Sequence, residues 1–483
     1  MDDLQEEYAI GLDFGTTHCC IGVYRNGGVE IIPNQNGERI TPSIITLVDE
    51  NTILKGEETL ENLVKYYDCS IYGIKRFIGR DFNNNSVKEK INLQNFPFNI
   101  VEDNQGKYPH IFFVKENKEI KFTLIEITSF IIRKMVDSAE FHLFRKINKL
   151  VISVPASFNN EQRLCIKSAA KLAGIEVLRI INEPSAAALS YGIEEKRNGT
   201  DIGKEKTILV FDLGGGFFDV TILKINEDEE NSFEILSTKG DKFLGGEDFD
   251  NKLVEFFLDK FCKNMKESKE IIKKDKKAIR KLKIACERIK RELSNRLEST
   301  LSITNFYNGN DILENIERKE FEKICQPLFE RLKLPIDDAL SDAKLSRNEI
   351  SEIILVGGSS RIPKIKSFLK EYFDGVKIND TINPDEAIAY RSTIMAAKIL
   401  NIKDDNFKRF NLMDITSLSL GLNIRNNSKD PEIQKEGYLM DVIIKRGLKI
   451  PYCITKIYIA FLDTYINVDI FEGEKNIINI IIF

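Results

Sequence analysis

A short pattern that occurs twice constrains the fold of this chain more than any other feature. An apolar run ends at Asp13 or Asp212, a turn of small residues follows, and a second β-rich run begins at Cys20 or Val220. Apolar runs joined by glycine turns predict β-hairpins. Because strands and helices alternate between the two copies, the sequence favours two related α/β lobes that face each other, with the turns at a cleft.

Further strands are expected between and after the hairpins. The pattern predicts strands at 149–154 and 177–181, with a helix at 160–173 between them. Glu183 then lies in a polar turn that precedes a helix, which is where α/β proteins place ligands. A third glycine turn, at 357–359, again follows an apolar strand.

Composition argues against several classes of protein. The chain has 75 acidic and 70 basic residues and a net charge of -5, so we expect no nucleic-acid partner. No stretch approaches the roughly 20 apolar residues that span a bilayer. The N-terminus is acidic rather than basic like a leader, so we expect a cytoplasmic protein without a membrane partner. The cysteines form no C-x-x-C pair, which favours reduced thiols over a zinc site or disulfides.

The glycine turns point to a bound nucleotide. Backbone amides held in such a turn bind phosphate, and three turns in one chain, two of them beside an aspartate, favour a polyphosphate with its metal. Mg²⁺ prefers oxygen ligands and keeps much of its water, so Asp13 and Asp212 are candidates to hold its hydration shell, with Asp219 nearby. Lys75 and Glu183 are candidates to neutralise a γ-phosphate and to orient water.

The lysine-rich segment 263–293 is interpreted as an amphipathic helix rather than a basic binding patch. Its apolar residues recur at intervals of three and four, which predicts one buried face with solvated lysines around it. A second face carries four polar residues that could contact a ligand together: Glu287, Lys290, Arg291 and Ser294.

These motifs resemble the seventy-kilodalton heat-shock (Hsp70) family, in family order from Tyr8 to Gly473. The matching segments are 11–17, 75–80, 154–158, 180–188, 211–216, 244–250, 285–291 and 355–363. Segment 244–251 looks most like the eukaryotic cytosolic branch. The resemblance implies an α/β fold: an actin-like (ribonuclease H-like) two-lobed ATPase domain, followed by an all-β peptide-binding sandwich. The implied function is that of an ATP-dependent chaperone that hydrolyses ATP to ADP and phosphate.

The resemblance also assigns site residues and partners. Asp13, Lys75, Glu183, Asp212 and Asp219 fall on catalytic positions, and the three aspartates on positions that coordinate Mg²⁺, with K⁺ as a further candidate ion. The positions that match nucleotide contacts are Gly15, Thr16, Thr17, His18, Gly214, Gly215, Gly216, Gly246, Glu287, Lys290, Arg291, Ser294, Gly357, Gly358, Ser359, Arg361 and Asp385. The implied partners are J-domain co-chaperones, nucleotide-exchange factors and unfolded client peptides.

Five residues depart from the family pattern. Phe217 replaces the threonine that usually follows the triple glycine, which removes a hydroxyl near the phosphates. His18 stands where tyrosine is common, and we interpret it as a neutral packing group. Arg391 replaces glycine and is expected to be a salt-bridged surface residue. Arg409 and Asn411 interrupt the apolar linker, which docks on the ATPase domain in the family's coupled state, and put the strength of coupling in doubt.

The expected organisation is an ATPase domain at 1–403, a linker at 404–414 and a partial β-sandwich at 415–483 without a helical lid. The last segment has room for six strands or fewer. Three explanations stay open: an interrupted sequence, a shortened chaperone that binds partners through its open edge, and a remnant. Two alternative functions also stay open: a nucleotide-binding, ribosome-associated regulator with little hydrolysis or peptide binding, and a sugar kinase on the same fold.

Overall fold

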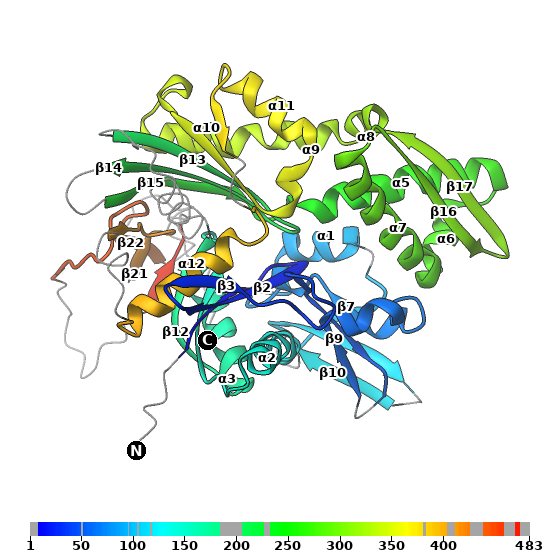
Figure 1. Cartoon of the computed structure of the whole chain (residues 1–483), viewed down its shortest axis with the longest axis horizontal. Helices are drawn as coiled ribbons and strands as arrows, with labels where there is room; N and C mark the ends of the chain where they lie inside the picture. The colour runs from blue at the N-terminus through cyan, green and yellow to red at the C-terminus, as the bar shows by residue number, and fades with distance from the viewer. Residues whose placement is uncertain are drawn as a thin grey trace.

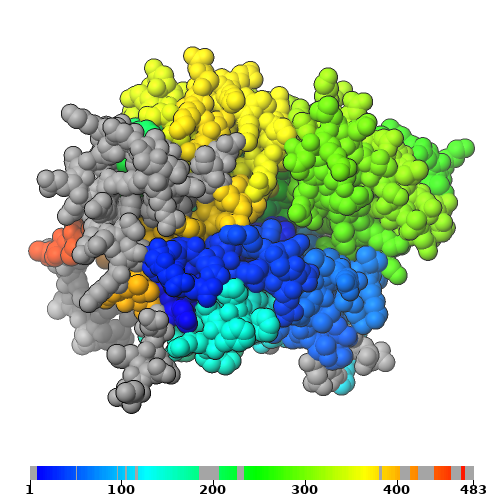
Figure 2. Space-filling view, viewed as in Figure 1, coloured from blue at the N-terminus to red at the C-terminus, as the bar shows by residue number. Residues whose placement is uncertain are grey.

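Two sheets of related topology organise the chain (Figure 1). The computed structural model describes residues 8–49, 52–94, 96–103, 106–115, 118–183, 205–226, 232–379, 383–402, 411–425, 438–457 and 469–473. We call the described residues up to 183 the first lobe and residues 205–379 the second lobe. Figure 2 shows the first lobe, blue to cyan, below the second, green to yellow, with the two surfaces meeting across the molecule.

The first lobe is built on a sheet in the order β12-β11-β1-β2-β3, with β4 against β2. Its strands are β1 (Ala9–Asp13), β2 (His18–Arg25), β3 (Gly28–Ile31), β4 (Thr41–Pro42), β11 (Lys149–Val154) and β12 (Glu176–Asn182). Two smaller sheets complete this lobe: β5 (Ile44–Leu47) with β6 (Ile53–Lys55) and β7 (Ser70–Tyr72), and β8 (Asn99–Glu102) with β9 (Pro109–Lys115) and β10 (Lys118–Thr123). Its helices are α1 (Asn85–Gln94), α2 (Leu124–Leu143) and α3 (Asn160–Leu172).

The second lobe repeats this plan in the order β19-β18-β13-β14-β15, and β20 extends the sheet at the edge beside β15. The strands are β13 (Glu205–Leu213), β14 (Phe218–Asn226), β15 (Ser232–Asp241), β18 (Glu352–Val356), β19 (Lys377–Asn379) and β20 (Asn411–Met413), with a separate hairpin of β16 (Glu298–Tyr307) and β17 (Asn310–Glu317). The helices are α5 (Gly246–Met265), α6 (Lys269–Lys274), α7 (Lys276–Asn295), α8 (Arg318–Ile324), α9 (Gln326–Arg331), α10 (Lys333–Ala343) and α11 (Pro363–Tyr372).

The twofold pattern predicted from the sequence is confirmed. In each lobe the first strand of the hairpin pairs antiparallel with the second strand and parallel with a later strand: β1 with β2 and β11, and β13 with β14 and β18. Asp13 and Asp212 both lie at the end of the first strand. The predicted strand 149–154 and the helix near 160–173 also form where expected.

Helix α7 confirms the interpretation of the lysine-rich segment. Asp275 caps its first turn by accepting a hydrogen bond from the Ala278 amide at 2.9 Å. The apolar face packs into the core of the second lobe through Ile279, Leu282, Cys286, Ile289 and Leu293, none more than 2% exposed. None of the helices among the described residues combines the length and apolar character that crossing a lipid bilayer requires.

The prediction for Arg391 is wrong. This residue lies on α12 (Ala387–Ile399), which packs against β1, β2 and β11, and only 2% of its surface is exposed. The Nε and Nη1 atoms have no hydrogen-bond partner among the described residues, and burial lowers the pKa of the guanidinium to about 9. A sequence pattern marks a position as charged, but the packing of a helix between two sheets decides whether that charge reaches water.

The C-terminal segment lies against the two lobes. Three strands pair in the order β22-β21-β23, with bounds β21 (Leu420–Arg425), β22 (Tyr438–Ile444) and β23 (Ile470–Glu472). Asn411 lies in β20, which pairs parallel with β15, so a strand forms at this position despite the polar residue. Arg446 donates to the Thr238 carbonyl at 2.6 Å, and Lys449 pairs with Glu234 at 2.7 Å. Most of the predicted linker, 404–410, lies outside the described residues.

Candidate functional site

A cavity of about 690 Å³ lies between the two lobes, within the size range of ligand pockets. Nearly all site residues predicted from the sequence line it: Asp13, Gly15, Thr16, Thr17, His18, Lys75, Glu183, Asp212, Gly214, Gly215, Gly216, Asp219, Glu287, Lys290, Arg291, Ser294, Gly357, Gly358, Ser359, Arg361 and Asp385. Gly246 is not among the lining residues. It supports the wall from behind, since its amide donates to the Gly214 carbonyl at 2.9 Å.

Three carboxylates from the hairpins lie buried in the wall of the cavity. Asp13 is the last residue of β1, and Asp212 lies near the end of β13. Asp219 pairs with Asp212 across the second hairpin. Burial, followed by the charge of Glu183, raises the pKa of Asp13 and of Asp219 to about 7, and the same two causes raise that of Asp212 well above its usual range. Negative groups crowded in this way are stabilised by a cation.

The Asp212 carboxylate gives a direct test of whether a cation fits here. Its Oδ2 atom is buried and has no hydrogen-bond partner among the described residues, whereas Asp13 accepts a hydrogen bond from Ser153 at 3.2 Å. Within the same residues, no cluster of three or more His, Cys, Asp or Glu side chains is arranged to hold a metal ion directly. The unpartnered, buried oxygen of Asp212, close to two further carboxylates, fits a bound cation, and Mg²⁺ is an ion that carboxylates can contact through its water shell.

Lys75 and Glu183 form a buried ion pair beside the carboxylates. They are 108 positions apart in the sequence, and the Lys75 Nζ donates to Glu183 Oε1 at 2.6 Å. Lys75 is 2% exposed, and its ammonium lies 5.6 Å from the ring centre of Phe14 and 6.0 Å from that of Phe158. The aromatic rings exclude water from the ammonium, so its charge acts strongly on anything bound in the cavity.

The glycine turns of the two lobes approach each other closely. A Cβ atom on Gly215 would lie 2.4 Å from the side chain of Thr17, and one on Gly216 would lie 2.7 Å from that of Thr16. Ser359, from the third turn, donates to the Gly214 carbonyl at 2.9 Å. Only glycine permits this approach, which brings backbone groups of both lobes to one place in the cavity.

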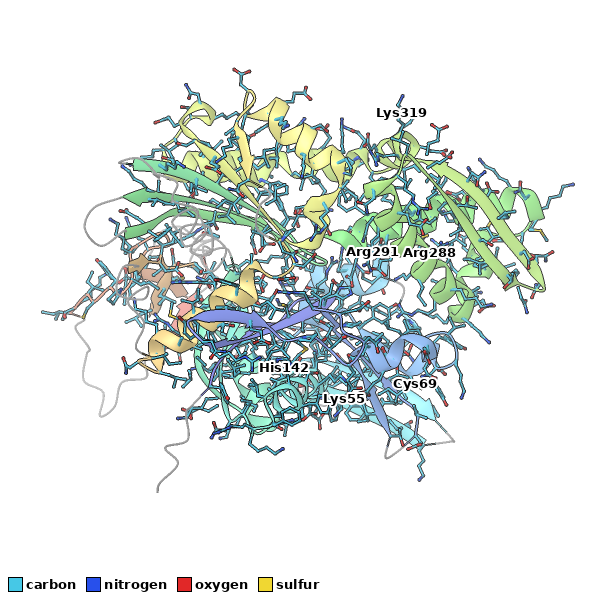
Figure 3. All side chains as sticks on the ribbon, in the orientation of Figure 1. Lys55, Cys69, His142, Arg288, Arg291 and Lys319 are labelled. Carbon is cyan, nitrogen blue, oxygen red and sulfur yellow. The ribbon has the colours of Figure 1, made fainter. Side chains whose placement is uncertain are left out.

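The polar face of α7 lines the cavity, as the sequence predicted. Lys290 pairs with Asp250 at 2.8 Å and donates to the Gly246 carbonyl at 3.1 Å. Figure 3 shows Arg291 beside Arg288 near α7, in the middle of the molecule. Across the cavity, Arg361 pairs with Asp385 at 2.8 Å. Arg291 and Arg361 thus present guanidinium groups from separate elements, which suits a planar ring between them.

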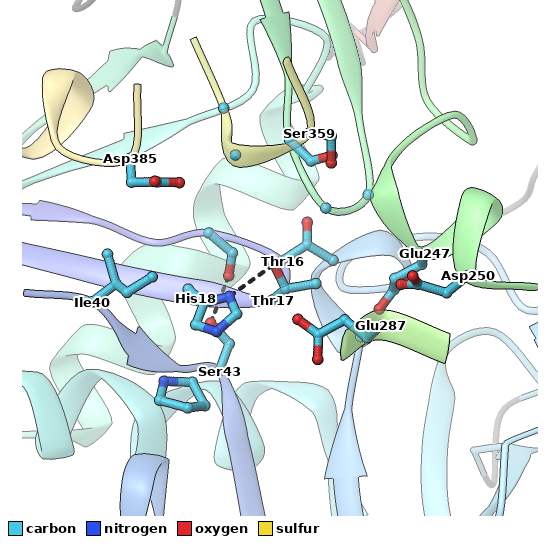
Figure 4. A pocket seen from close by; sticks show the side chains of 18 of the residues that line it. Thr16, Thr17, His18, Ile40, Ser43, Glu247, Asp250, Glu287, Ser359 and Asp385 are labelled. Carbon is cyan, nitrogen blue, oxygen red and sulfur yellow. Dashed lines mark hydrogen bonds between the residues drawn. The ribbon is translucent and has the colours of Figure 1, made fainter. Parts of the chain in front are cut away.

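His18 lines the cavity close enough to Glu287 and Asp385 to feel their charges. Its Nδ1 is 3.3 Å from the Thr17 hydroxyl, as the dashed line in Figure 4 shows. Burial is the largest effect on the imidazole and lowers its pKa, and the charge of Glu287 opposes this shift more weakly. His18 is therefore neutral near pH 7, in agreement with its interpretation as an uncharged packing group.

Several lining residues were not predicted from the sequence. Glu247 and Asp250 lie beside Glu287 in Figure 4, and burial raises the pKa of Asp250 to about 7. Both belong to the segment 244–250, which carries part of the family resemblance, so this motif marks them as candidate lining residues. Tyr72 and Arg280 also line the cavity, with the Arg280 guanidinium 4.1 Å from the Tyr72 ring centre. No local pattern marks these two, because they meet only in the folded chain.

Comparison with known proteins gives one consistent result. The family model described as "Hsp70 protein" matches residues 9–479. Heat shock 70 kDa protein 2 of Paracoccidioides lutzii is 39% identical over 472 residues, which cover 97% of this chain and 68% of that protein. A heat shock 70 kDa protein of Neurospora crassa is 38% identical over 470 residues, covering 97% and 69%. Heat shock cognate 70 kDa protein 3 of Dictyostelium discoideum is 37% identical over 469 residues, covering 97% and 71%.

Proposed function

The chain belongs to the Hsp70 family and is an ATP-dependent chaperone, and we propose that it hydrolyses ATP to ADP and phosphate in the cavity between its lobes. The two-lobed α/β part fits the actin-like ATPase domain of that family. Family membership does not favour a regulator with little hydrolysis, and it favours a chaperone over a sugar kinase. The observation that carries the proposal is the buried pair of Lys75 and Glu183 beside three carboxylates.

The proposed roles follow from where the charges lie. Phosphoryl transfer depends on positioning and on neutralising charge rather than on covalent chemistry. Lys75, held by Glu183 at 2.6 Å, would stabilise negative charge that grows on the γ-phosphate. Glu183 would accept a hydrogen bond from the attacking water. The turns at Thr16 and Gly215 would donate backbone hydrogen bonds to the phosphates.

Mg²⁺ is the cation that this chemistry requires, and Asp13, Asp212 and Asp219 would hold its water shell. When bound, such an ion neutralises phosphate charge and orients the phosphate chain. The unpartnered Oδ2 of Asp212 and the raised pKa of all three carboxyl groups support this assignment. A K⁺ ion is a further candidate for the same negative end of the cavity.

Co-chaperones and clients are the partners expected for this family. We propose J-domain proteins, nucleotide-exchange factors and unfolded peptides as the specific classes. The proposed domains are 1–403 for the ATPase, 404–414 for the linker and 415–483 for a β-sandwich that binds peptide. The pairing of β20 with β15 and the ion pair of Lys449 with Glu234 support coupling between peptide binding and the nucleotide cavity.

The experiment that tests the proposal is single-turnover ATP hydrolysis by the full chain, with and without a J-domain. Lys75→Ala should lower the rate by about 10²-fold or more, the loss expected when one charge-stabilising donor is removed. Lys283→Ala is the matched control, because Lys283 lines the same cavity but donates to the Gln94 carbonyl. Tight ATP binding with equal turnover by the wild type and Lys75→Ala would refute the proposal.

A further inference from the structure

Phe217 is a residue of the second lobe whose side chain is buried in the core of the first. It lies in the turn between β13 and β14, where its carbonyl accepts a hydrogen bond from the Gly214 amide at 3.1 Å. Only 5% of Phe217 is exposed, and the apolar cluster that contains it otherwise consists of first-lobe residues. Its ring meets that of Phe158 edge to face, with the centroids 5.8 Å apart.

The rest of the turn is also inserted into the first lobe. Arg76 of the first lobe donates to the Gly215 carbonyl at 3.3 Å and pairs with Asp248 of α5 at 3.0 Å. The Gly216 backbone lies against Arg76 and Thr16, as the close approach of a Cβ at that position shows. Phe217, which also lines the cavity, thus adds an apolar anchor to a polar contact between the lobes.

The neighbouring residue shows that this placement is specific. Phe218 is also a phenylalanine and is fully buried, but it packs on Phe211 at 4.7 Å within the core of the second lobe. Two adjacent rings therefore point into the cores of different lobes, as expected for successive residues at the start of a strand. Separation of the lobes would bring Phe217 into water and leave Phe218 buried.

We propose that Phe217 is a positioning residue that anchors the phosphate turn of the second lobe in the first lobe, keeps the cavity closed and so slows the release of bound nucleotide. This inference rests on the proposed function, because it assumes a nucleotide in the cavity. Opening the cavity requires the phenyl ring to leave an apolar core, and that exposure raises the barrier to release. Phe217 also contacts Phe158, which flanks Lys75, so the anchor supports the catalytic lysine from one side.

The test measures how fast a fluorescent ADP analogue with Mg²⁺ dissociates from the full chain after mixing with excess ATP. Phe217→Thr should release the analogue about tenfold faster or more, while the association rate changes by less than about threefold, since the anchor is broken only on opening. Phe217→Leu keeps an apolar side chain and should restore most of the slow release. Phe218→Leu is the matched control: it should lower the thermal unfolding midpoint yet leave the dissociation rate unchanged.

A double variant separates the anchor from general loosening of the core. Phe158→Leu should speed release, as Phe217→Thr does. The double variant with both substitutions should release the analogue no faster than the faster of the two single variants, because both substitutions remove the same ring contact. Equal release rates for wild type and Phe217→Thr, or equal acceleration by Phe218→Leu, would overturn the inference. A wild type that binds no nucleotide would instead refute the proposed function. If Phe217→Thr does not fold, the comparison of Phe158→Leu, which should speed release, with Phe218→Leu, which should not, decides.

Discussion

The two hairpins at the cavity share a backbone plan but differ in the side chains that complete it. In the first, Phe14 follows the aspartate and packs within its own lobe, whereas in the second Phe217 packs in the opposite lobe. Cys20 faces Asp13 across the first hairpin, whereas Asp219 faces Asp212 across the second. The two lobes therefore contribute different groups to the cavity. The first lobe supplies the ion pair of Lys75 and Glu183, whereas the second hairpin supplies the additional carboxylate of Asp219 and the apolar ring of Phe217.

The largest expected effect concerns the aspartates. Asp212→Asn should lower single-turnover hydrolysis by about 10²-fold, because it removes charge from a carboxylate whose Oδ2 has no partner among the described residues. Asp13→Asn should lower it less, since Asp13 also serves as an acceptor for Ser153. The rates are compared at saturating Mg²⁺ and ATP.

Asp137→Asn controls for the loss of any carboxylate. Asp137 lies on the exposed side of α2 in an ion pair with Arg133, and its loss should change hydrolysis by less than about twofold. If Asp13→Asn proves as damaging as Asp212→Asn, the hairpins are functionally equivalent and the comparison fails.

Alanine substitutions at Gly15 and Gly215, one in each hairpin turn, should separate an effect on folding stability from an effect on the rate of nucleotide release. A Cβ on Gly15 would lie 1.9 Å from the His18 carbonyl in its own turn, so Gly15→Ala should destabilise the first lobe by about 1–3 kcal/mol. A Cβ on Gly215 would instead meet Thr17 of the other lobe at 2.4 Å, so Gly215→Ala should mainly speed nucleotide release. Urea unfolding and analogue dissociation measure the two effects.

Gly214→Ala is the control for this pair. The nearest atom to its added Cβ is the Phe217 carbonyl oxygen at 3.9 Å, an ordinary contact, so its unfolding midpoint should match that of the wild type. Faster release by Gly15→Ala than by Gly215→Ala would contradict the assignment of lobe contact to the second hairpin.

The last expected effect, which leaves hydrolysis aside, is a pH dependence of stability in the metal-free, nucleotide-free protein. Burial raises the pKa of Asp219 from 3.8 to about 7, so the folded state holds a proton that the unfolded state has lost between these values. The free energy of unfolding contributed by this group therefore falls as pH rises from about 4 to 7, by at most about 1.4 kcal/mol per pH unit.

The difference between wild type and Asp219→Asn isolates that contribution. The variant should lose part of the slope in urea unfolding measured at pH 5, 6 and 7, and Asp137→Asn should keep it. Mg²⁺ with nucleotide should reduce the slope in the wild type, because binding favours the charged carboxylate. An identical slope in Asp219→Asn would show that Asp219 is not the linked group.

Much of the fold could be predicted because it depends on local patterns. The hairpins, the strand at 149–154 and the two faces of α7 follow from apolar periodicity and glycine turns. Residues that meet across long distances could not be predicted in this way. Arg391 was assigned to the surface, and the lining role of Tyr72 was not foreseen, since neither residue carries a neighbouring pattern that records its partner.

The sequence by itself determined which backbone turns form and which charged side chains follow them, because glycine conformation, strand alternation and helix periodicity act within a few residues. The tertiary structure alone decided that Lys75 meets Glu183 at 2.6 Å and that Phe217 enters the core of the opposite lobe while Phe218 stays in its own. These outcomes depend on how two sheets pack against each other, and burial, not residue type, then sets the charge of the carboxylates and the exposure of the rings.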